Sequence, residues 1–291
     1  VAVSTIGLAA CSRKEAPTIQ KDSPAKPAAV VTTPAQFKPA VGASDIDKGR
    51  ASALMQAIFG NDYQAENGTA LITIESSEDA QVWRMTLYAS RELPDGRTVV
   101  VVNGAPSDEN GADLTAHASQ GMLNVYTVRR KSAAWQVIER HENVGMMGSS
   151  GNIGVVNRIE LGNDKPGIGL TSGSSWFGNT IARAELFDLN GGMRSLGSFN
   201  EFSSNFGACL PETEDCWEVD SKFGTVPRAG SGDFFDIVVQ FEGKHFRVIE
   251  DENGNHVERP TRLIRQTARY RFNGKEYVLV SGENPVPEIA G

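Results

Sequence analysis

The chain has 291 residues, of which 28 are basic and 36 are acidic, so its formal net charge is −8, and 40% of its residues are hydrophobic. This length and hydrophobic fraction allow one large or two small domains with a buried core. The acidic balance argues against a nucleic-acid partner, because such proteins present a basic surface. No run of about 18 apolar residues is present, so the sequence predicts no membrane-spanning helix.

The N-terminal segment is apolar and ends in a cysteine. Residues 1–10 carry no charge and finish with Leu8-Ala9-Ala10, which precede Cys11. An aliphatic residue, two small residues and a cysteine resemble the lipobox of bacterial lipoproteins. The resemblance covers residues 1–11 and implies that residues 1–10 are part of a signal peptide and that Cys11 is the lipidated first residue of the mature chain. An ordinary apolar terminus with a free cysteine is the alternative.

The same resemblance implies a location. Acyl chains such as palmitate on Cys11 would bind the membrane, because each buried CH₂ group contributes about 0.8 kcal/mol. Ser12 stands where enterobacterial lipoproteins that stay in the inner membrane carry aspartate. The resemblance therefore implies a bacterial envelope protein that is lipid-anchored in the outer membrane and faces the periplasm.

Residues 11–43 have the composition of a spacer. They contain five prolines, many small residues and almost no large apolar side chain, a composition that cannot compensate the entropy lost on folding. We expect a disordered tether that could reach up to roughly 100 Å in extended form. Five basic and two acidic side chains give it a net charge of +3, which leaves −11 for residues 44–291, the predicted single folded domain.

Residues 44–60 are predicted to form one helix. Ser44 is a suitable N-cap, Asp45 and Asp47 suit the positive helix end, and Gly60 stands where a C-terminal glycine is expected. Leu54, Met55, Ile58 and Phe59 make one apolar stripe. This stripe packs on the rest of the domain or binds a partner.

From about residue 69 the hydrophobic pattern has a period of two. Apolar side chains alternate in residues 81–88, 233–241 and 262–272, and Asx-Gly turn signals are frequent. The sequence therefore predicts an all-β fold of about a dozen strands, an antiparallel meander of hairpins preceded by one short helix. A weak repeat favours a β-propeller-like arrangement, and a two-sheet β-sandwich explains the same strands.

Cys209 and Cys216 are predicted to form a disulfide. They lie seven positions apart with Pro211 between them, a spacing that suits a disulfide loop in an exported protein. A reactive thiol pair is the alternative. No histidine or CxxC pattern lies nearby to complete a metal site.

The sequence contains no recognised catalytic, metal or cofactor motif. Glycines at every third position in residues 145–154 match no phosphate-binding fingerprint and predict a β-loop. The alternating oxygen ligands of Asp251, Asn253 and Asn255 resemble a calcium loop, but a hairpin turn is favoured because the glycine is misplaced.

Three arginines and two tryptophans are the candidate binding residues. Arg265, Arg269 and Arg271 share one face of the strand at residues 262–272 and could contact an anion or a partner protein. Pairing with neighbouring acids such as Glu250 or Glu276 is the alternative. Trp176 and Trp217 are predicted to lie in loops, where they could stack on a sugar.

These features predict an envelope lipoprotein whose domain binds or scaffolds. Its partners would be the membrane, through the anchor, and another envelope protein or a cell-wall glycan. Two other functions stay open: a glycan-directed hydrolase whose carboxylates come from several loops, and an inhibitor of a cell-wall hydrolase.

Overall fold

The computed structural model describes residues 46–75, 80–190, 192–211, 213, 215–228 and 234–289. The predicted signal peptide, the lipidation site Cys11, the tether at residues 11–43 and the predicted helix cap Ser44 lie outside these residues.

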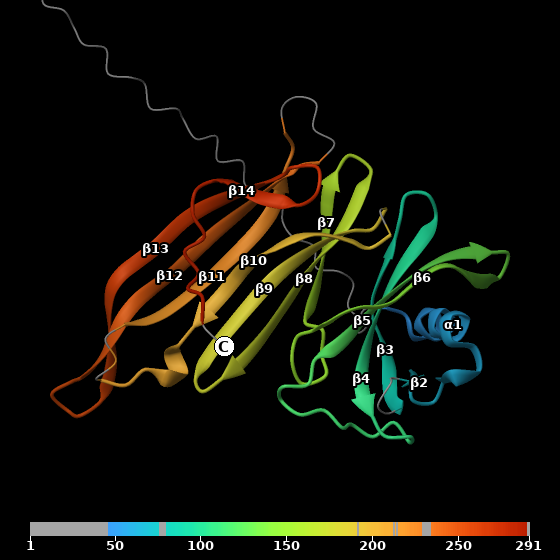
Figure 1. The fold of residues 1–291 in the computed structure, drawn as a ribbon, viewed down its shortest axis with the longest axis horizontal. Coiled ribbons are helices and arrows are strands. Elements are labelled where there is room, and N and C mark those ends of the chain that lie inside the picture. Colours follow the sequence, from blue (N-terminus) through green and yellow to red (C-terminus); the bar gives the residue numbers. More distant parts are fainter. Residues whose placement is uncertain are drawn as a thin grey trace, which may run out of the picture. The chain divides into compact units, whose positions relative to one another are not determined.

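The described part of the chain is mostly β-structure, as predicted, and forms two antiparallel sheets in chain order (Figure 1). The first sheet contains β1 (Tyr63–Gln64), β2 (Thr69–Glu75), β3 (Ala80–Glu92), β4 (Arg97–Ser107), β5 (Gly121–Lys131) and β6 (Ala134–Met147). The second contains β7 (Val155–Gly162), β8 (Lys165–Trp176), β9 (Asn179–Asp188), β10 (Arg194–Ser204), β11 (Cys216–Val226), β12 (Asp236–Glu250), β13 (His256–Phe272) and β14 (Tyr277–Ser281). The short 3₁₀ helices η2 (Gly60–Asp62) and η3 (Phe206–Ala208) lie between these elements.

Of the two predicted arrangements, the two-sheet alternative describes this fold. Each sheet is a meander of hairpins, with six and eight strands respectively. A propeller would repeat four-stranded blades, and these sheets do not.

Among the described residues there is one α-helix, α1 (Lys48–Phe59), and it is shorter than the predicted helix. The cap is Asp47 rather than Ser44, because the Asp47 side chain accepts a hydrogen bond from the Arg50 backbone N at 3.0 Å. The helix ends at Gly60, whose φ of +59° is accessible to a residue without Cβ. All four residues of the predicted apolar stripe are buried, and they pack on Val100, Val102 and Tyr126 of the first sheet.

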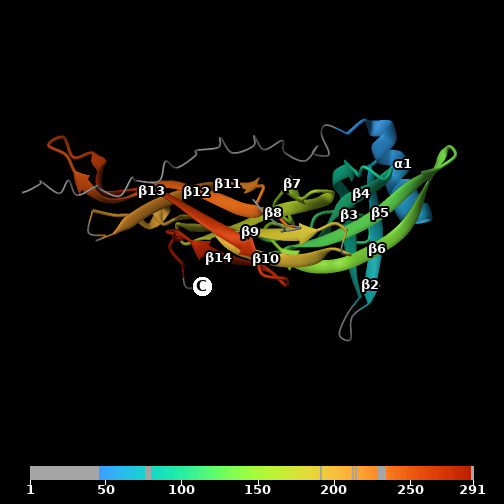
Figure 2. The same ribbon diagram turned by 90° about the horizontal axis from the view of Figure 1, so that it is seen from above.

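The central strands of the first sheet, β4 and β5, are buried on both faces. Val100 and Val102 of β4 contact α1, whereas Val99 and Val101 belong to a second core shared with β7–β9. Figure 2 shows α1 on one side of this sheet and β7–β9 on the other. A strand covered on both sides needs apolar residues in both alternating sets, which explains the run of four valines.

The second sheet has its own core on one face. The predicted alternation of Ile237, Val239 and Phe241 in β12 is confirmed, and so is that of Ile264, Ala268 and Tyr270 in β13. Because paired residues of antiparallel strands share a face, the register Ile237↔Tyr270 and Val239↔Ala268 brings both sets together. We call this side the core face and the opposite side the outer face.

The β12–β13 hairpin extends past β14 (Figure 1). Described residues of β14 pair only with Arg269–Phe272, so the earlier part of β13 is a sheet edge. All eight residues from His256 to Leu263 are exposed. Pro260 lies in this stretch, and the register shifts by one residue beside it. Residues 244–263 are called the arm below.

Candidate binding surface on the arm

The predicted disulfide between Cys209 and Cys216 is present, with the two Cα atoms 6.0 Å apart. Cys216 opens β11 and packs with Phe246 and Val248 on the outer face. Asn205 stabilises the loop further, since its Oδ1 accepts from the Trp217 backbone N at 2.7 Å and its Nδ2 donates to the Asp215 carbonyl at 3.1 Å. The disulfide loop is therefore anchored at the base of the arm.

Trp176 and Trp217 lie in strands and not in the predicted loops. Trp176 is the last residue of β8, before the turn at Phe177 and Gly178. The prediction of a loop at Trp176 was wrong because the residues before it are rich in glycine, which is typical of loops. A Cβ added at Gly173 would lie 2.4 Å from the Ile181 carbonyl oxygen, so that glycine permits close strand approach.

Trp217 is held in place at the edge of the core face. Its indole Nε1 donates to the Ser203 Oγ at 2.9 Å. On the next strand its partner in the register is His245. A fixed, half-buried indole can still offer ring surface to a ligand.

Arg269 and Arg271 are both engaged by one buried carboxylate. Arg269 donates to Asp236 at 3.1 Å, and Arg271 makes two hydrogen bonds to it at 3.0 and 3.1 Å. Burial raises the pKa of Asp236, but the hydrogen bonds from Arg271 and Arg269 outweigh burial and lower that pKa below its ordinary value. The alternative of pairing with a neighbouring acid thus describes both arginines, although the acid is Asp236 and not Glu250 or Glu276.

Arg265 differs from the other two predicted arginines. It is exposed on the outer face, directly opposite Glu242 of β12. Of the three predicted arginines, Arg265 is therefore exposed, whereas Arg269 and Arg271 form ion pairs within the sheet.

A different group of basic residues gathers on the core face of the arm. His245 lies opposite Arg262, and Arg247 lies opposite Arg259. Paired residues share a face, so these four side chains form a two-by-two group beside Trp217, which we call the cationic face. The sequence alone does not reveal this group, because the grouping depends on a register that shifts at Thr261.

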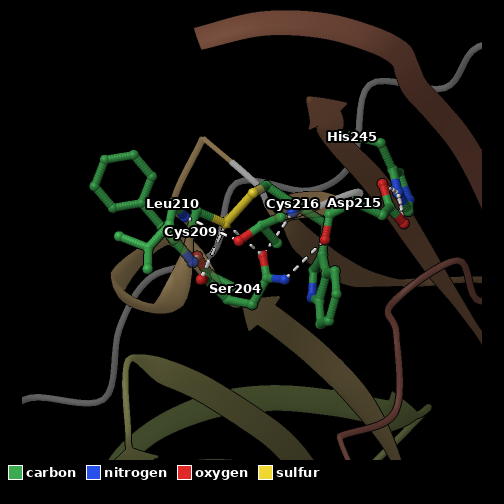
Figure 3. Close-up of a disulfide and its surroundings, with 10 residues drawn as sticks. Ser204, Cys209, Leu210, Asp215, Cys216 and His245 are labelled. Carbon is green, nitrogen blue, oxygen red and sulfur yellow. Dashed lines mark hydrogen bonds and ion pairs between the residues drawn. A yellow bond between two sulfur atoms is a disulfide. The ribbon is translucent and has the colours of Figure 1, made fainter. Parts of the chain in front are cut away.

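The charges on the cationic face are only partly neutralised within the part of the chain that the structure describes. His245 Nδ1 lies 3.0 Å from both carboxylate oxygens of Asp215, and Figure 3 shows the two side chains facing each other beside the disulfide. The neighbouring Lys244–Glu258 ion pair lies on the outer face. Arg259 and Arg262 take part in no ion pair between described residues.

The other sequence candidates have structural roles. In the glycine-rich segment, Gly148, Gly151 and Gly154 all have positive φ, and a Cβ at Gly148 would lie 1.9 Å from the Asn152 carbonyl oxygen, which supports the loop interpretation. Asp251 accepts hydrogen bonds from the backbones of Asn253 and Asn255, as in a hairpin turn. Described residues contain no group of three or more potential metal ligands.

A glycan-directed hydrolase would need carboxylates that face a recess. A recess of about 310 Å³ at the end of α1 is lined by Asp62 and Glu142, among others. Glu142 Oε1 accepts from the Tyr126 hydroxyl at 3.2 Å and from Arg140 at 3.1 Å, which gives it a structural role. Glu201 on β10 has a raised pKa because it is partly buried and lies near Asp220, despite a hydrogen bond from Thr171. It does not line this recess, nor a second recess of about 430 Å³ beside the start of α1.

No protein-family model, curated protein or solved structure matches the chain significantly. Within the described residues, no helix combines the length and apolarity needed to cross a bilayer. The function is accordingly inferred from the chain's own residues.

Proposed function

We propose that the protein is a lipid-anchored component of the bacterial envelope whose folded domain binds a carboxylate-bearing cell-wall glycan through the cationic face. The observation that carries the binding part is the group of Arg259, Arg262, Arg247 and His245 on an otherwise exposed hairpin. The whole chain is acidic, so this group is a local reversal of charge.

The chemistry of the cationic face suits an anionic sugar polymer. Guanidinium groups bind carboxylates through paired charge-assisted hydrogen bonds, and the adjacent Trp217 indole can stack on a sugar ring. The two cross-strand pairs of this group lie one after the other along the ribbon, so a polymer that follows the ribbon meets both of them. A two-stranded ribbon is marginally stable alone, and the disulfide loop at its base stabilises it on the outer face.

The anchoring part is supported by the sequence before residue 44. The lipobox-like Leu8-Ala9-Ala10-Cys11 and the proline-rich spacer are coherent with a domain held at a distance from a membrane. A disulfide is also the form in which cysteines persist in an oxidising compartment such as the periplasm.

Binding can be tested by co-sedimentation of the full chain with purified, protease-treated cell-wall glycan. We expect Arg262→Ala to weaken binding at least tenfold, about 1.4 kcal/mol. Arg265→Ala is the matched control, because it removes an equal charge from the outer face of the same strand. Two results would contradict a glycan-specific cationic face. One is an equal loss of binding in both variants, and the other is co-sedimentation of the protein only with glycan that has not been protease-treated.

Anchoring requires a separate experiment. Cells expressing the chain with its complete leader are labelled with a palmitate analogue, and the wild type is compared with Cys11→Ala. We expect label in the wild type alone, and equal label in both would refute lipidation at Cys11.

A further inference from the structure

A recess of about 430 Å³ lies between the start of α1 and the end of the first sheet. Its walls come from one helix, four strands and two turns, and four of its nine lining residues are glycine or alanine, which leaves the space open. The lining residues are Gly49, Arg50, Ala53, Glu92, Gly96, Thr98, Arg130, Ala133 and Trp135. This volume lies within the range of small-molecule sites.

Two guanidinium groups are held at one indole in this recess. The guanidinium carbons of Arg50 and Arg130 lie 5.7 and 5.9 Å from the centroid of Trp135. Arg130 and Trp135 are direct partners in the β5–β6 register, and Arg50 is placed by the capped first turn of α1. Such cation–π contacts orient the guanidinium groups while leaving their N–H donors available.

Glu92 is the only carboxylate among the lining residues, and it neutralises the positive charge of the recess weakly. Glu92 Oε2 lies 3.7 Å from Arg50 Nη2, and its side chain is two-thirds exposed. Arg130 forms no ion pair with another described residue. The positive end of the α1 dipole adds to the same potential.

Two buried polar atoms of the lining residues lack a hydrogen-bond partner among the described residues, Thr98 Oγ1 and Arg50 Nε. Thr98 is only 1% exposed. It lies on the same face of β4 as Val100 and Val102, the face that points to α1. Native proteins seldom leave buried donors unpaired, and such atoms indicate a missing partner.

We infer that this recess binds a small molecule of about monosaccharide size through an oxyanion, either a carboxylate or a phosphate group. The donors that surround it are the guanidinium groups of Arg50 and Arg130, with the unpaired Arg50 Nε–H in the first, and the Thr98 hydroxyl. Together they complement an acceptor with several oxygens. This site lies on the first sheet, so it is independent of glycan binding by the arm.

The experiment is isothermal titration of the full chain with glucuronate, glucose 6-phosphate, inorganic phosphate and neutral glucose. We expect one of the anions to bind and glucose not to bind, and the preferred anion identifies the carboxylate or the phosphate. Arg130→Ala is expected to weaken binding at least tenfold, whereas Arg129→Ala, an equal loss of charge at the neighbouring exposed position, retains it. Absence of binding by all the anions at millimolar concentration, or equal weakening by both substitutions, would overturn the inference.

Thr98→Val supplies a readout that a purely structural residue would not give. Valine has nearly the same shape and removes the unpaired hydroxyl, so the unliganded variant is expected to unfold at a higher temperature than the wild type while binding the anion more weakly. A variant that is less stable without ligand and binds unchanged would show that the hydroxyl serves the fold and not the site.

Discussion

Arg262 of β13 and His245 of β12 lie directly opposite each other across the ladder. Asp215 of the disulfide loop contacts His245. This contact connects the cationic face to the loop that the disulfide closes. A change in the loop should therefore alter how the arm presents its arginines.

Charge reversal at Arg262 should have a larger effect than its removal. Arg262→Glu is expected to abolish glycan co-sedimentation at low salt, because it places a carboxylate beside the bound anion. Arg265→Glu on the opposite face is expected to bind nearly as the wild type. Raising the salt concentration should weaken wild-type binding progressively, since exposed charges are screened. Binding that does not depend on salt would exclude an electrostatic contact.

Removal of the disulfide should destabilise the domain. The bridge closes a loop of eight residues, for which the chain-entropy estimate is about 2.5 kcal/mol at room temperature. Cys209→Ser/Cys216→Ser should lower the free energy of unfolding in urea by about that amount. A reducing agent should have the same effect on the wild type and none on the double variant. An unchanged wild type in reductant, after thiol titration confirms that the bridge is open, would contradict this role.

Asp236→Asn should destabilise the second sheet at neutral pH. The substitution removes the charge that accepts from both Arg269 and Arg271, and hydrogen bonds to charged groups contribute about 1.5–3 kcal/mol. Because the folded pKa of Asp236 is lowered, its stabilising contribution is present above the ordinary value of 3.8 and is lost as the pH falls through the folded pKa. Urea titrations of both proteins should therefore converge below pH 3.8, and a constant difference would exclude the charge as the cause.

Glu201→Gln should act in the opposite direction. Burial raises the pKa of Glu201 above its ordinary 4.5, so the folded chain holds this proton at a higher pH than the unfolded chain does. Wild-type stability then falls as the pH rises through that interval. The glutamine variant should be more stable at pH 7 in thermal unfolding, and the advantage should shrink below pH 4.5. The exposed Glu218→Gln is the control and should show no such trend.

The fold class followed from local patterns, whereas the grouping of side chains did not. Alternation in residues 233–241 and 262–272 reflects burial of one sheet face, which is a local property of each strand. The helix boundary was less exact, because three acceptable capping residues, Ser44, Asp45 and Asp47, stand close together. Only the structure shows that Asp47 accepts the Arg50 N–H.

The candidate sites depended on register, which periodicity alone cannot supply. Arg265, Arg269 and Arg271 were correctly placed on one face, but Asp236, the partner of Arg269 and Arg271, lies more than thirty positions away from both. The group formed by Arg259 and Arg262 was hidden because the register shift at Thr261 brings residues three positions apart to the same side. Thr98 gave no sequence signal, since an unpaired buried hydroxyl looks like any strand threonine.

Pro260 has a consequence for association between copies of the protein. An open edge strand offers its backbone groups to any neighbouring chain. Proline contributes no N–H to such a ladder, and the adjacent register shift breaks the regular spacing that a second strand would need. The exposed edge of the arm is thus protected against edge-to-edge joining of two copies.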